Sequence, residues 1–459
     1  MAHQPHDQGG SGAQGATLGA PDTIAAPATP AGRGGIAVLR VSGPRTRDVA
    51  VAVLGRLPAS REATLAAFRD GDGGVIDRGI ALFFPAPHSY SGEDVLELQG
   101  HGGPVVVHEL LRRCLEAGAR MARPGEFTER AFLNGRLDLA QAESVADLID
   151  ASTVQAARSA ARSLEGDFSR RIDAIARAML DIRMHVEACI DFPEEEIDPE
   201  DVEAIARKVD SVTAQLDALI DTASQGAVLR EGLTVVLFGR PNVGKSSLLN
   251  RLAGEELAIV TPVPGTTRDY VRAAISVDGV PIHIIDTAGL REAADEVERI
   301  GVERSRAALA KADAAVLVVD ASQREDSAGM RDEVPMGMPH VRVENKIDLA
   351  GGSASESADG STIRLSARTG DGVELLRRWL LRTAGWKPPG EGLFMARRRH
   401  VDALHRARVH LGVAASRSAA FELKAEELRL AHRALGEITG EVSADALLGE
   451  IFSRFCIGK

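Results

Sequence analysis

Five short motifs, in a fixed order between Gly239 and Arg368, constrain this chain more than any other feature. They are Gly239–Ser246 (GRPNVGKS), Gly265–Thr267 (GTT), Asp286–Gly289 (DTAG), Asn345–Asp348 (NKID) and Ser366–Arg368 (SAR). A glycine-rich loop between a strand and a helix cradles phosphates, because its backbone N–H groups and the helix N-terminus favour anions. Five such motifs in order predict a guanine-nucleotide site in a Ras-like P-loop domain.

The phosphate loop is the best-defined of these motifs. The apolar run Thr234–Phe238 predicts a buried strand, and Lys245–Leu252 predicts the helix that follows it. Lys245 is expected to contact the β and γ phosphates as a catalytic group, and Ser246 to offer its hydroxyl to Mg²⁺. The full set of expected GTP contacts is Asn242, Val243, Gly244, Lys245, Ser246, Ser247, Thr261, Pro262, Val263, Pro264, Gly265, Thr266, Thr267, Asp286, Thr287, Ala288, Gly289, Asn345, Lys346, Ile347, Asp348, Ser366, Ala367 and Arg368.

A hairpin is predicted downstream, where Ala273–Val277 and Ile282–Ile285 flank Asp278-Gly279. The second strand would deliver Asp286 toward Mg²⁺ through water. Thr267 is the expected second hydroxyl ligand of Mg²⁺, and the Gly289 N–H is expected to reach the γ-phosphate.

Asp348 is expected to choose the base. A carboxylate accepts hydrogen bonds from the N1–H and the exocyclic amine of guanine together, and adenine lacks that pair of donors. Asn345 and Lys346 would buttress the loop, and the backbone at Ser366–Ala367 would donate to guanine O6. The sequence therefore predicts GTP rather than ATP.

The catalytic water raises a question, because Leu290 stands where signalling GTPases carry a glutamine. An acidic run follows, and its members either help to hold the water or form a solvated helix face: Glu292, Asp295, Glu296 and Glu298. Asn242 is either an ordinary turn residue or the ligand of a monovalent cation beside the phosphates.

The length and composition of the whole chain limit its possible class and location further. Its 459 residues predict about three domains. No apolar stretch reaches about 18 residues, so no membrane span is expected. Residues 1–21 lack Lys and Arg and are predicted to be a disordered extension rather than a secretory signal. Three widely separated cysteines indicate neither a disulfide framework nor a zinc site and fit a reducing cytoplasm.

The charge pattern allows local basic patches only, because the net charge is −12. The run Arg397–His400, with Arg406 and Arg408, is either such a patch or a solvated helix face. Lysines are scarce in the sequence, and Lys459 at the chain end therefore draws notice beside Lys245 and Lys346.

The chain is predicted to be a multidomain α/β protein. Residues 22–136 alternate strand-like stretches (Gly35–Val41, Gly79–Phe84 and Val95–Leu98) with an amphipathic helix, Pro104–Glu116, and predict an α+β domain. Two glycine clusters in it, residues 32–35 and 100–103, are expected to form turns or to admit a ligand, with turns favoured. Helical periodicity in 137–226 and 389–459, on both sides of a GTPase module at 227–388, predicts a helical domain that is discontinuous in sequence.

Outside the GTPase module, the chain resembles the MnmE (TrmE) family of bacterial GTPases that modify the wobble uridine of tRNA. The resemblance runs from about residue 22 to the end. It rests on motifs at residues 28–35, 92–103, 123–127, 131–134, 138–143 and 191–195, and on the closing Phe455-Cys456-Ile457-Gly458-Lys459.

This resemblance implies an N-terminal domain that binds 5-formyl- or 5,10-methylene-tetrahydrofolate and forms a homodimer. By position, Arg40, Glu97, Arg136 and Lys459 match the folate contacts, although Arg136 stands where many members have lysine. Asn242, Thr261, Val263 and Thr266 match ligands of a K⁺ ion that supports hydrolysis when two GTPase domains meet. Glu298 matches the acid that positions the attacking water.

The implied reaction adds an aminomethyl or carboxymethylaminomethyl group at C5 of the wobble uridine. It involves a partner of the MnmG family that carries FAD, in a heterotetramer with two copies of each subunit, and tRNA. Cys456 is either a nucleophile toward the uracil ring or a buried small residue near the chain end.

Two other functions remain open from the sequence. One is a ribosome-assembly GTPase, which would share the nucleotide motifs but usually adds an RNA-binding module or a second GTPase domain. The other is a scaffold whose GTP cycle only changes its dimer contacts. The segment Ala321–His340, short and rich in Met, Pro and Gly, leaves the outer layer of the GTPase module open.

Overall fold

The computed structural model describes residues 22–191, 199–254, 273–286, 309–323, 334–387, 392–416, 419–442 and 445–458. These residues form two compact units. Unit 1 comprises residues up to Asp138 together with the C-terminal segment from Ala444, and unit 2 runs from Leu139 to Ser443.

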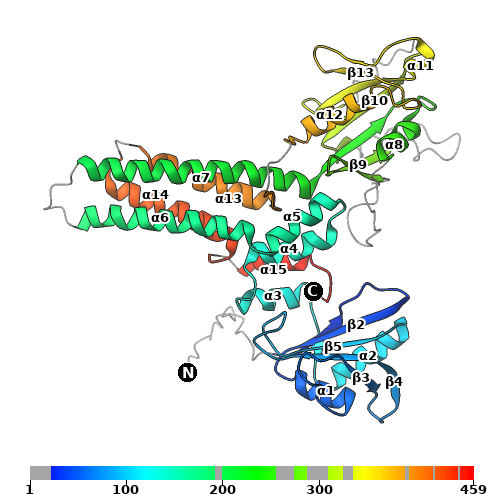
Figure 1. The fold of residues 1–459 in the computed structure, drawn as a ribbon, viewed down its shortest axis with the longest axis vertical. Helices are drawn as coiled ribbons and strands as arrows, with labels where there is room; N and C mark the ends of the chain where they lie inside the picture. Colours follow the sequence, from blue (N-terminus) through cyan, green and yellow to red (C-terminus); the bar gives the residue numbers. More distant parts are fainter. Residues whose placement is uncertain are drawn as a thin grey trace, which may run out of the picture. The chain divides into compact units, whose positions relative to one another are not determined.

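Unit 1 contains an α+β fold over residues 22–138 together with the C-terminal segment, which the sequence pattern assigns to the helical domain (Figure 1). Its sheet has the order β3-β4-β5-β2-β1-β6 and is antiparallel except for the β1–β6 pair. Its elements are β1 (Ile24–Pro27), β2 (Gly34–Ser42), α1 (Thr46–Leu54), β3 (Thr64–Arg69), β4 (Val75–Phe84), β5 (Val95–Gly102), α2 (Pro104–Glu116), β6 (Arg120–Met121), α3 (Glu126–Leu133) and α15 (Asp445–Ser453). Helices α1 and α2 share one core with alternate residues of the strands, such as Leu39, Val41 and Leu98.

The two glycine clusters were expected to favour turns, and this was wrong for most of their residues. Gly34 and Gly35 open β2, and Gly100 to Gly102 end β5, where Gly34 pairs with Gly102. A Cβ atom at Gly102 would lie 2.6 Å from the Gly34 carbonyl oxygen. These glycines therefore permit close strand pairing, which a sequence reading cannot separate from a turn.

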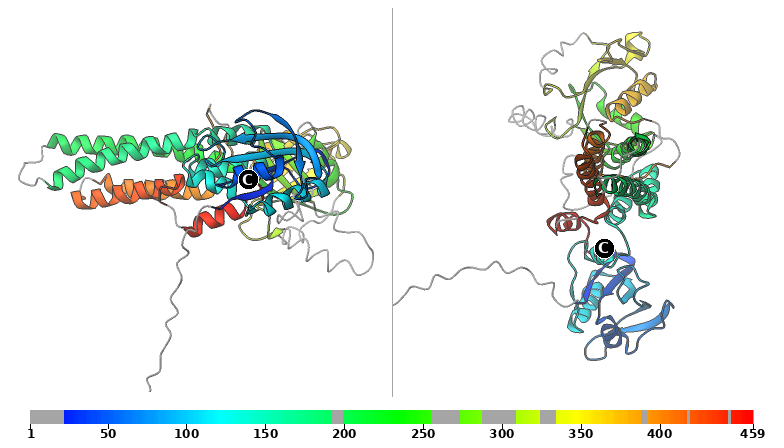
Figure 2. Two further views of the ribbon diagram at one scale, coloured as in Figure 1. Left: turned by 90° about the horizontal axis from the view of Figure 1, so that it is seen from below. Right: turned by 90° about the vertical axis from the view of Figure 1, so that its left-hand side faces the viewer.

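The helical part of unit 2 begins with α4 (Leu139–Asp150) and α5 (Val154–Leu164). Four longer helices form a bundle, in which α6 lies beside α7 and α14, and α13 lies beside α7 and α14 (Figures 1 and 2). They are α6 (Asp167–Asp191), α7 (Pro199–Glu231), α13 (Arg398–Ala414) and α14 (Phe421–Thr439). Apolar residues at steps of three and four, such as Ile172, Ile175 and Met179, form the bundle core.

The other part of unit 2 is the GTPase module, whose sheet has the order β12-β13-β11-β10-β7-β9-β8. The strands are parallel except for the edge pairs β8–β9 and β12–β13. Its elements are β7 (Leu233–Phe238), α8 (Lys245–Ala253), β8 (Ala273–Val277), β9 (Val280–Asp286), β10 (Ala314–Asp320), β11 (His340–Asn345), α11 (Ile347–Ala350), β12 (Ser355–Glu356), β13 (Thr362–Arg364) and α12 (Val373–Thr383). Helices α8 and α12 pack on one face of this sheet. The other face carries a second cluster of buried apolar residues, such as Val236, Phe238 and Leu317.

Several predicted boundaries are confirmed. Helix α2 has the predicted ends, and β7 and α8 extend their predicted ranges by one residue. The Asp278-Gly279 hairpin joins β8 to β9, and both turn residues have positive φ, as a type I′ turn requires. The Ala321–His340 segment lies partly outside the described residues, between β10 and β11.

Candidate guanine-nucleotide site and folate region

The phosphate loop lies at the carboxyl end of β7, where the sheet order reverses direction. The chain leaves β7 for α8, and the neighbours of β7 are β9 on one side and β10 on the other. Ligands of parallel sheets bind at such switch points. Lys245 is buried at the start of α8, and its Nζ donates to the carbonyl oxygens of Gly239 and Arg240, each at 2.9 Å. The ammonium group therefore already lies inside the loop.

Asn345 joins the phosphate loop to the guanine loops. Its Nδ2 donates to the Val243 carbonyl at 2.9 Å, and its Oδ1 accepts from the Ala367 N–H at 2.9 Å. A Cβ atom at Gly244 would lie 2.3 Å from Asn345 Nδ2, so this contact needs a glycine. Lys346 adds a second link, because its Nζ donates to the Asn242 carbonyl at 2.7 Å and to Asp320 at 2.6 Å.

Asp348 is prepared to accept hydrogen bonds as an anion. Ser366 Oγ donates to its Oδ1 at 2.6 Å, and Arg368 lies 2.6 Å from its Oδ2. The hydrogen bond from Ser366 and the charge of Arg368 lower the pKa of the Asp348 carboxyl. An ionised Asp348 suits the pair of N–H donors on guanine, so the structure brings the predicted base-recognition residues together.

The predicted Mg²⁺ ligands fall partly within the described residues. Ser246 and Ser247 are exposed in the first turn of α8. Asp286 ends β9 in register with Leu237 of β7, so the two phosphate motifs leave neighbouring strands. The Ser246 hydroxyl at this edge is the kind of oxygen ligand that a hard cation such as Mg²⁺ takes.

Other predicted nucleotide and catalytic residues lie outside the described part of the chain. They are Thr261, Pro262, Val263, Pro264, Gly265, Thr266, Thr267, Thr287, Ala288, Gly289 and Glu298, together with Leu290 and the other acids near Glu298. Their roles stay predictions.

In unit 1, two of the predicted folate residues form a pair across strands. Arg40 on β2 is in register with Glu97 on β5, and its Nε and Nη2 donate to Glu97 Oε1 at 3.0 and 2.9 Å. The Arg40 guanidinium lies over the rings of Tyr90 and Phe127, at 5.1 and 5.7 Å from their centroids. Burial raises the pKa of the Tyr90 hydroxyl, which shares a hydrogen bond with Thr128.

Arg136 is exposed, and among the described residues no hydrogen bond or ion pair joins it to the Arg40–Glu97 pair. It follows a short turn that is fixed to the segment before β5. Asn134 Nδ2 donates to the Ser91 carbonyl at 2.7 Å, and a Cβ at Gly92 would lie 3.2 Å from Arg136 Cγ.

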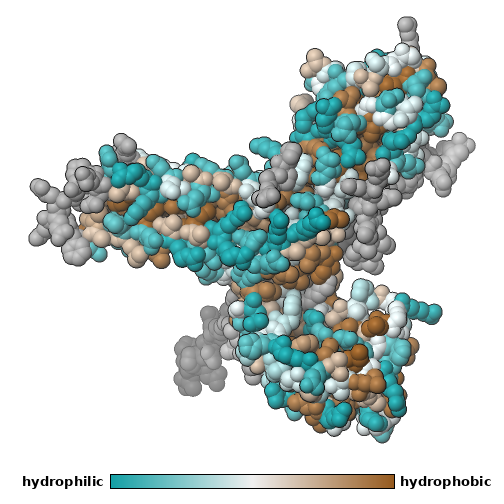
Figure 3. All heavy atoms as spheres, viewed as in Figure 1, coloured by the Kyte–Doolittle hydropathy of each residue, from teal (hydrophilic) through white to brown (hydrophobic). Residues whose placement is uncertain are grey.

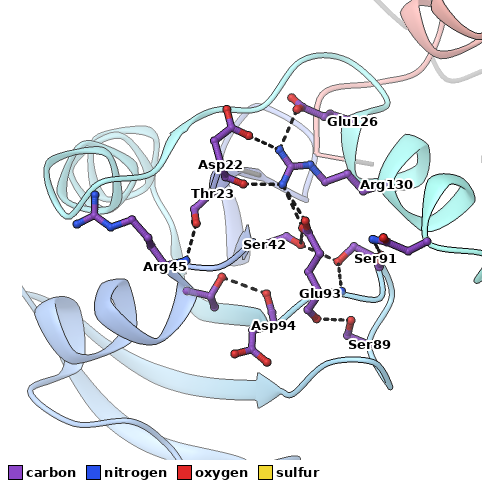
Figure 4. Close-up of polar contacts among 12 residues, drawn as sticks. Asp22, Thr23, Ser42, Arg45, Ser89, Ser91, Glu93, Asp94, Glu126 and Arg130 are labelled. Atoms are coloured by element: carbon purple, nitrogen blue, oxygen red, sulfur yellow. Dashed lines mark hydrogen bonds and ion pairs between the residues drawn. The ribbon is translucent and has the colours of Figure 1, made fainter. Parts of the chain in front are cut away.

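A network of charged and hydroxyl side chains lies next to this turn (Figure 4). Arg130 donates to Glu93 at 3.1 Å, to Asp22 at 2.7 Å and to Glu126 at 3.1 Å. Burial alone would raise the pKa of the Glu126 carboxyl, but hydrogen bonds from Arg120, the Arg123 backbone and Arg130 lower it to about 2. The term "unit 1 network" below denotes Asp22, Glu93, Arg120, Glu126 and Arg130.

The chain end lies within unit 1. The Gly125 N–H, at the start of α3, donates to the Cys456 carbonyl at 3.3 Å. Cys456 is exposed, so the alternative that it is a buried small residue was wrong: Phe452 and Phe455 occupy the interior in its place. Lys459 lies outside the described residues.

The basic run Arg397–His400 is neither a nucleic-acid patch nor a simple solvated face. Arg399 Nη2 and His400 Nε2 contact Glu143 Oε2 at 2.6 and 2.8 Å, and Arg397 Nη2 donates to Asp147 Oδ1 at 2.8 Å. Burial raises the pKa of Glu143, but the opposing charges and hydrogen bonds outweigh it and lower that pKa. The term "unit 2 cluster" below denotes Glu143, Asp147, Arg230, Arg397, Arg399 and His400.

Sequence reasoning missed this cluster because its acids and bases are far apart in the chain. Glu143 closes the 138–143 motif, and its partners follow about 250 residues later. A sequence signal for this cluster does exist. Glu143 and Asp147 are four positions apart, on the same helix face as the apolar residues Leu139 and Ala140, and a buried acid needs a partner. Arg406 and Arg408, in contrast, pair on the surface with Glu437 and Asp217.

None of the helices among the described residues has the length and apolar character needed to cross a membrane. The same residues contain no group of three or more His, Cys, Asp or Glu side chains that could hold a metal ion.

The fold and the order of its nucleotide motifs define a P-loop GTPase. The profile described as the MnmE helical domain matches residues 139–456, and the profile described as the GTP-binding protein TrmE N-terminus matches residues 23–136. The chain therefore belongs to the MnmE (TrmE) family, and it is a GTP hydrolase with an α+β domain and a helical domain around its GTPase module.

Known proteins similar to this chain include two named tRNA modification GTPase MnmE. The protein of Azoarcus sp. (strain BH72) is 58% identical over 96% of this chain and 98% of its own length. That of Ralstonia nicotianae is 58% identical over 95% of this chain and 96% of its own length. Among solved structures, the G domain of the T. maritima FeoB iron transporter is 26% identical over 33% of this chain and 98% of that chain, with a TM-score of 0.26.

Proposed function

We propose that this chain is the GTP-hydrolysing subunit of a system that modifies the wobble uridine of certain tRNAs. It adds a carboxymethylaminomethyl or aminomethyl group at C5, with a flavoprotein of the MnmG family as partner. The observation that carries this proposal is the match to relatives of that name over almost the entire chain, together with the assembled guanine site. The test is mass spectrometry of tRNA nucleosides from a strain that lacks the protein. Unchanged wobble-uridine modification would defeat the proposal.

In this function the chain's own residues hold the nucleotide. Lys245 contacts the β and γ phosphates, Asp348 fixes the guanine, and Asn345 keeps the two loops in register. Mg²⁺, held by Ser246 and Thr267, would neutralise phosphate charge as the bond to the γ-phosphate breaks. Glu298 orients the attacking water. Glu298→Ala should retain nucleotide binding and lower hydrolysis by roughly two to three decades; hydrolysis at the parental rate would remove this role.

A K⁺ ion is proposed beside the phosphates, with Asn242, Thr261, Val263 and Thr266 as ligands. Asn242 supports this, because its side chain is exposed and makes no hydrogen bond with the described residues. Its φ of 62° lies in the left-handed region, which asparagine adopts more readily than most residues. Replacement of K⁺ by Na⁺ should lower turnover, and equal rates in both salts would reject the ion site.

A tetrahydrofolate derivative bound at the proposed folate region of unit 1 would supply the one-carbon unit. The Arg40–Glu97 pair is mostly but not fully buried, with side chains 20% and 17% exposed, and each partner retains hydrogen-bonding capacity for a ligand. Arg136 and Lys459 would complete the contacts. Arg40→Ala should weaken binding of 5-formyltetrahydrofolate in a titration, whereas Arg47→Ala, which breaks an exposed pair with Asp94, serves as the control. Absence of binding to the native protein would reject the site.

The proposal includes a homodimer, a heterotetramer with two partner subunits, and work in the cytoplasm. An apolar surface on unit 1 supports self-association. Leu65 on edge strand β3 pairs with Ile80 on β4, and the two are 78% and 40% exposed. Figure 3 shows further hydrophobic residues at the surface of this unit. Light scattering should report a dimer, and Leu65→Asp should weaken it. A native protein that stays monomeric with a γ-phosphate mimic in K⁺ would contradict this part.

A further inference from the structure

Helices α4 and α5, residues 139–164, lie where the GTPase module meets the helical bundle (Figure 1). The 138–143 motif opens α4, and nothing in the nucleotide or folate sites accounts for it. Three connections between the module and the bundle involve this pair of helices.

The first connection is the tip of the β8–β9 hairpin. Thr153 Oγ1 donates to the Gly279 carbonyl at 2.8 Å and accepts from the Ala156 N–H at 3.1 Å. One buried hydroxyl therefore caps α5 and holds the hairpin. A Cβ atom at Gly279 would lie 2.8 Å from the Cβ of Gln155, so the tip approaches α5 too closely for a side chain.

The second connection is the end of α7, which leads directly into β7. Arg230 Nε donates to Asp147 Oδ1 on α4 at 2.9 Å, three positions before β7 begins at Leu233. The side chains of Arg230 and Asp147 are 35% and 6% exposed, so salt screens this pair less than a pair between two exposed side chains.

The third connection is the segment that returns from the GTPase module to the bundle. The Met395 N–H donates to the Ser159 carbonyl at 3.1 Å, and Ser163 Oγ donates to the Met395 carbonyl at 2.9 Å. Ala156 and Ala160 of α5 share one hydrophobic core with Val280 and Ile282 of β9. The core of the GTPase module thus continues into α5.

The strands held at α4 and α5 are those that end at the phosphate motifs. β7 leads to the phosphate loop and β9 ends at Asp286, and the two are parallel neighbours. Each spans roughly 20 Å at about 3.3 Å per residue. A displacement of these strands at the nucleotide end has a direct path to their other end, because a hydrogen-bonded pair of buried strands moves as one body.

α4 passes such a displacement on to the bundle through the unit 2 cluster. Glu143 accepts from Arg399 and His400 of α13, and Arg399 Nη1 also donates to the Glu437 carbonyl of α14 at 3.0 Å. Buried charges have few arrangements in which all of them are paired, so the cluster favours discrete positions over gradual drift.

We propose that α4 and α5 are the coupling element of this GTPase. A nucleotide-dependent shift of β7 and β9 is carried by Asp147 and Thr153 into α4 and α5, and by Glu143 into α13. Thr153, Asp147 and Glu143 are positioning residues that touch no nucleotide. The proposal rests on the GTPase class alone and is independent of the RNA and folate assignments.

Amide hydrogen exchange of the full chain tests this coupling. The probe is the exchange of GDP for guanosine 5′-(β,γ-imido)triphosphate with Mg²⁺ and K⁺. In the native protein, the exchange rates of amides in 139–164 and in α13 should change by about fivefold or more, as expected for typical coupling between sites. Unchanged exchange in 139–164 would overturn the proposal.

Variants of Thr153 separate its two hydrogen bonds. Thr153→Asp keeps an acceptor for the helix cap but removes the donor to Gly279, whereas Thr153→Ser keeps both. Thr153→Asp should retain the nucleotide response of α8 and reduce that of α13 to less than about twofold, and Thr153→Ser should respond like the native chain. A full response of α13 in Thr153→Asp would reject the role of Thr153.

Two further variants complete the design. Arg230→Gln removes the second connection at a half-exposed side chain and should also reduce the response of α13. Thr222→Val, which loses only a hydroxyl bonded to its own helix at Ala218, is the matched control and should respond fully. A full response of α13 in Arg230→Gln, or a reduced one in Thr222→Val, would contradict the assigned path.

Discussion

The unit 1 network and the unit 2 cluster both join distant parts of the sequence through arginine and carboxylate pairs, but water reaches them differently. In unit 1, the side chains of Arg120 and Asp22 are 42% and 49% exposed. In unit 2, those of Glu143 and Asp147 are 1% and 6% exposed. The open network borders a proposed ligand region, where groups can exchange partners with solvent. The carboxylates of the closed cluster are almost fully buried, so their hydrogen bonds must be made within the protein.

The largest expected difference between the two regions concerns stability. Glu143→Ala would leave Arg397 and Arg399, whose side chains are only 13% and 24% exposed, without this carboxylate, which costs about 3–5 kcal/mol. Both tryptophans of the chain, Trp379 and Trp386, lie in unit 2, so their fluorescence in a urea titration reports this loss. Glu426→Ala, an exposed acid on α14, is the control and should change stability by less than about 0.5 kcal/mol. A Glu143→Ala protein as stable as this control would show that the cluster contributes little.

A smaller loss is expected in unit 1. Glu126→Gln removes one charge but keeps an acceptor beside Arg120, whose exposed guanidinium can turn to water. The expected destabilisation is about 1–3 kcal/mol, the cost of a charged hydrogen bond. Because unit 1 contains no tryptophan, the measurement is amide exchange in β1 and α3. Destabilisation as large as that of Glu143→Ala would remove the distinction between the open and the closed network.

The stability of the two units should also depend on pH in different ways. Burial lowers the pKa of His400 below 6.5, so the unfolded chain binds more protons below that pH and unit 2 loses stability as the pH falls. In unit 1, the pKa of Glu126 is about 2 against 4.5 for a free glutamate, so its contribution is lost only as the pH falls from 4.5 toward 2. The urea midpoint of tryptophan fluorescence should therefore drop between about pH 7 and pH 5, while exchange protection in α3 stays level. His400→Gln should flatten the first profile, and an unchanged slope would assign it to another group.

How much the sequence predicts depends on how local the determining residues are. The phosphate loop, the guanine motifs and the Asp278-Gly279 hairpin were predicted because each is set by a few neighbouring residues. The roles of Arg397 and His400 were not, because Glu143 and Asp147 lie far away in the chain. The strand glycines were misjudged for a related reason, since what excludes a side chain at Gly102 is the backbone of Gly34.

The proposed folate region lies between these extremes. The Arg40–Glu97 pair joins residues 57 positions apart, and only the register of β2 with β5 brings them together. Resemblance to a family supplied these two residues, whereas their spacing in the sequence could not. The division into domains and the contacts of Arg136 and Lys459 stay predictions.

The two hydrogen bonds of Asn345 hold the phosphate loop and the loop at Ala367 at a set spacing. Both loops are hydrogen-bonded to the same side-chain amide. The distance between the guanine base and the α- and β-phosphates should therefore be the same for every bound guanine nucleotide. GDP and GTP share the base, the ribose and the first two phosphates, so this end of the pocket should bind both with similar affinity. Discrimination between GDP and GTP then depends on the residues that face the γ-phosphate position.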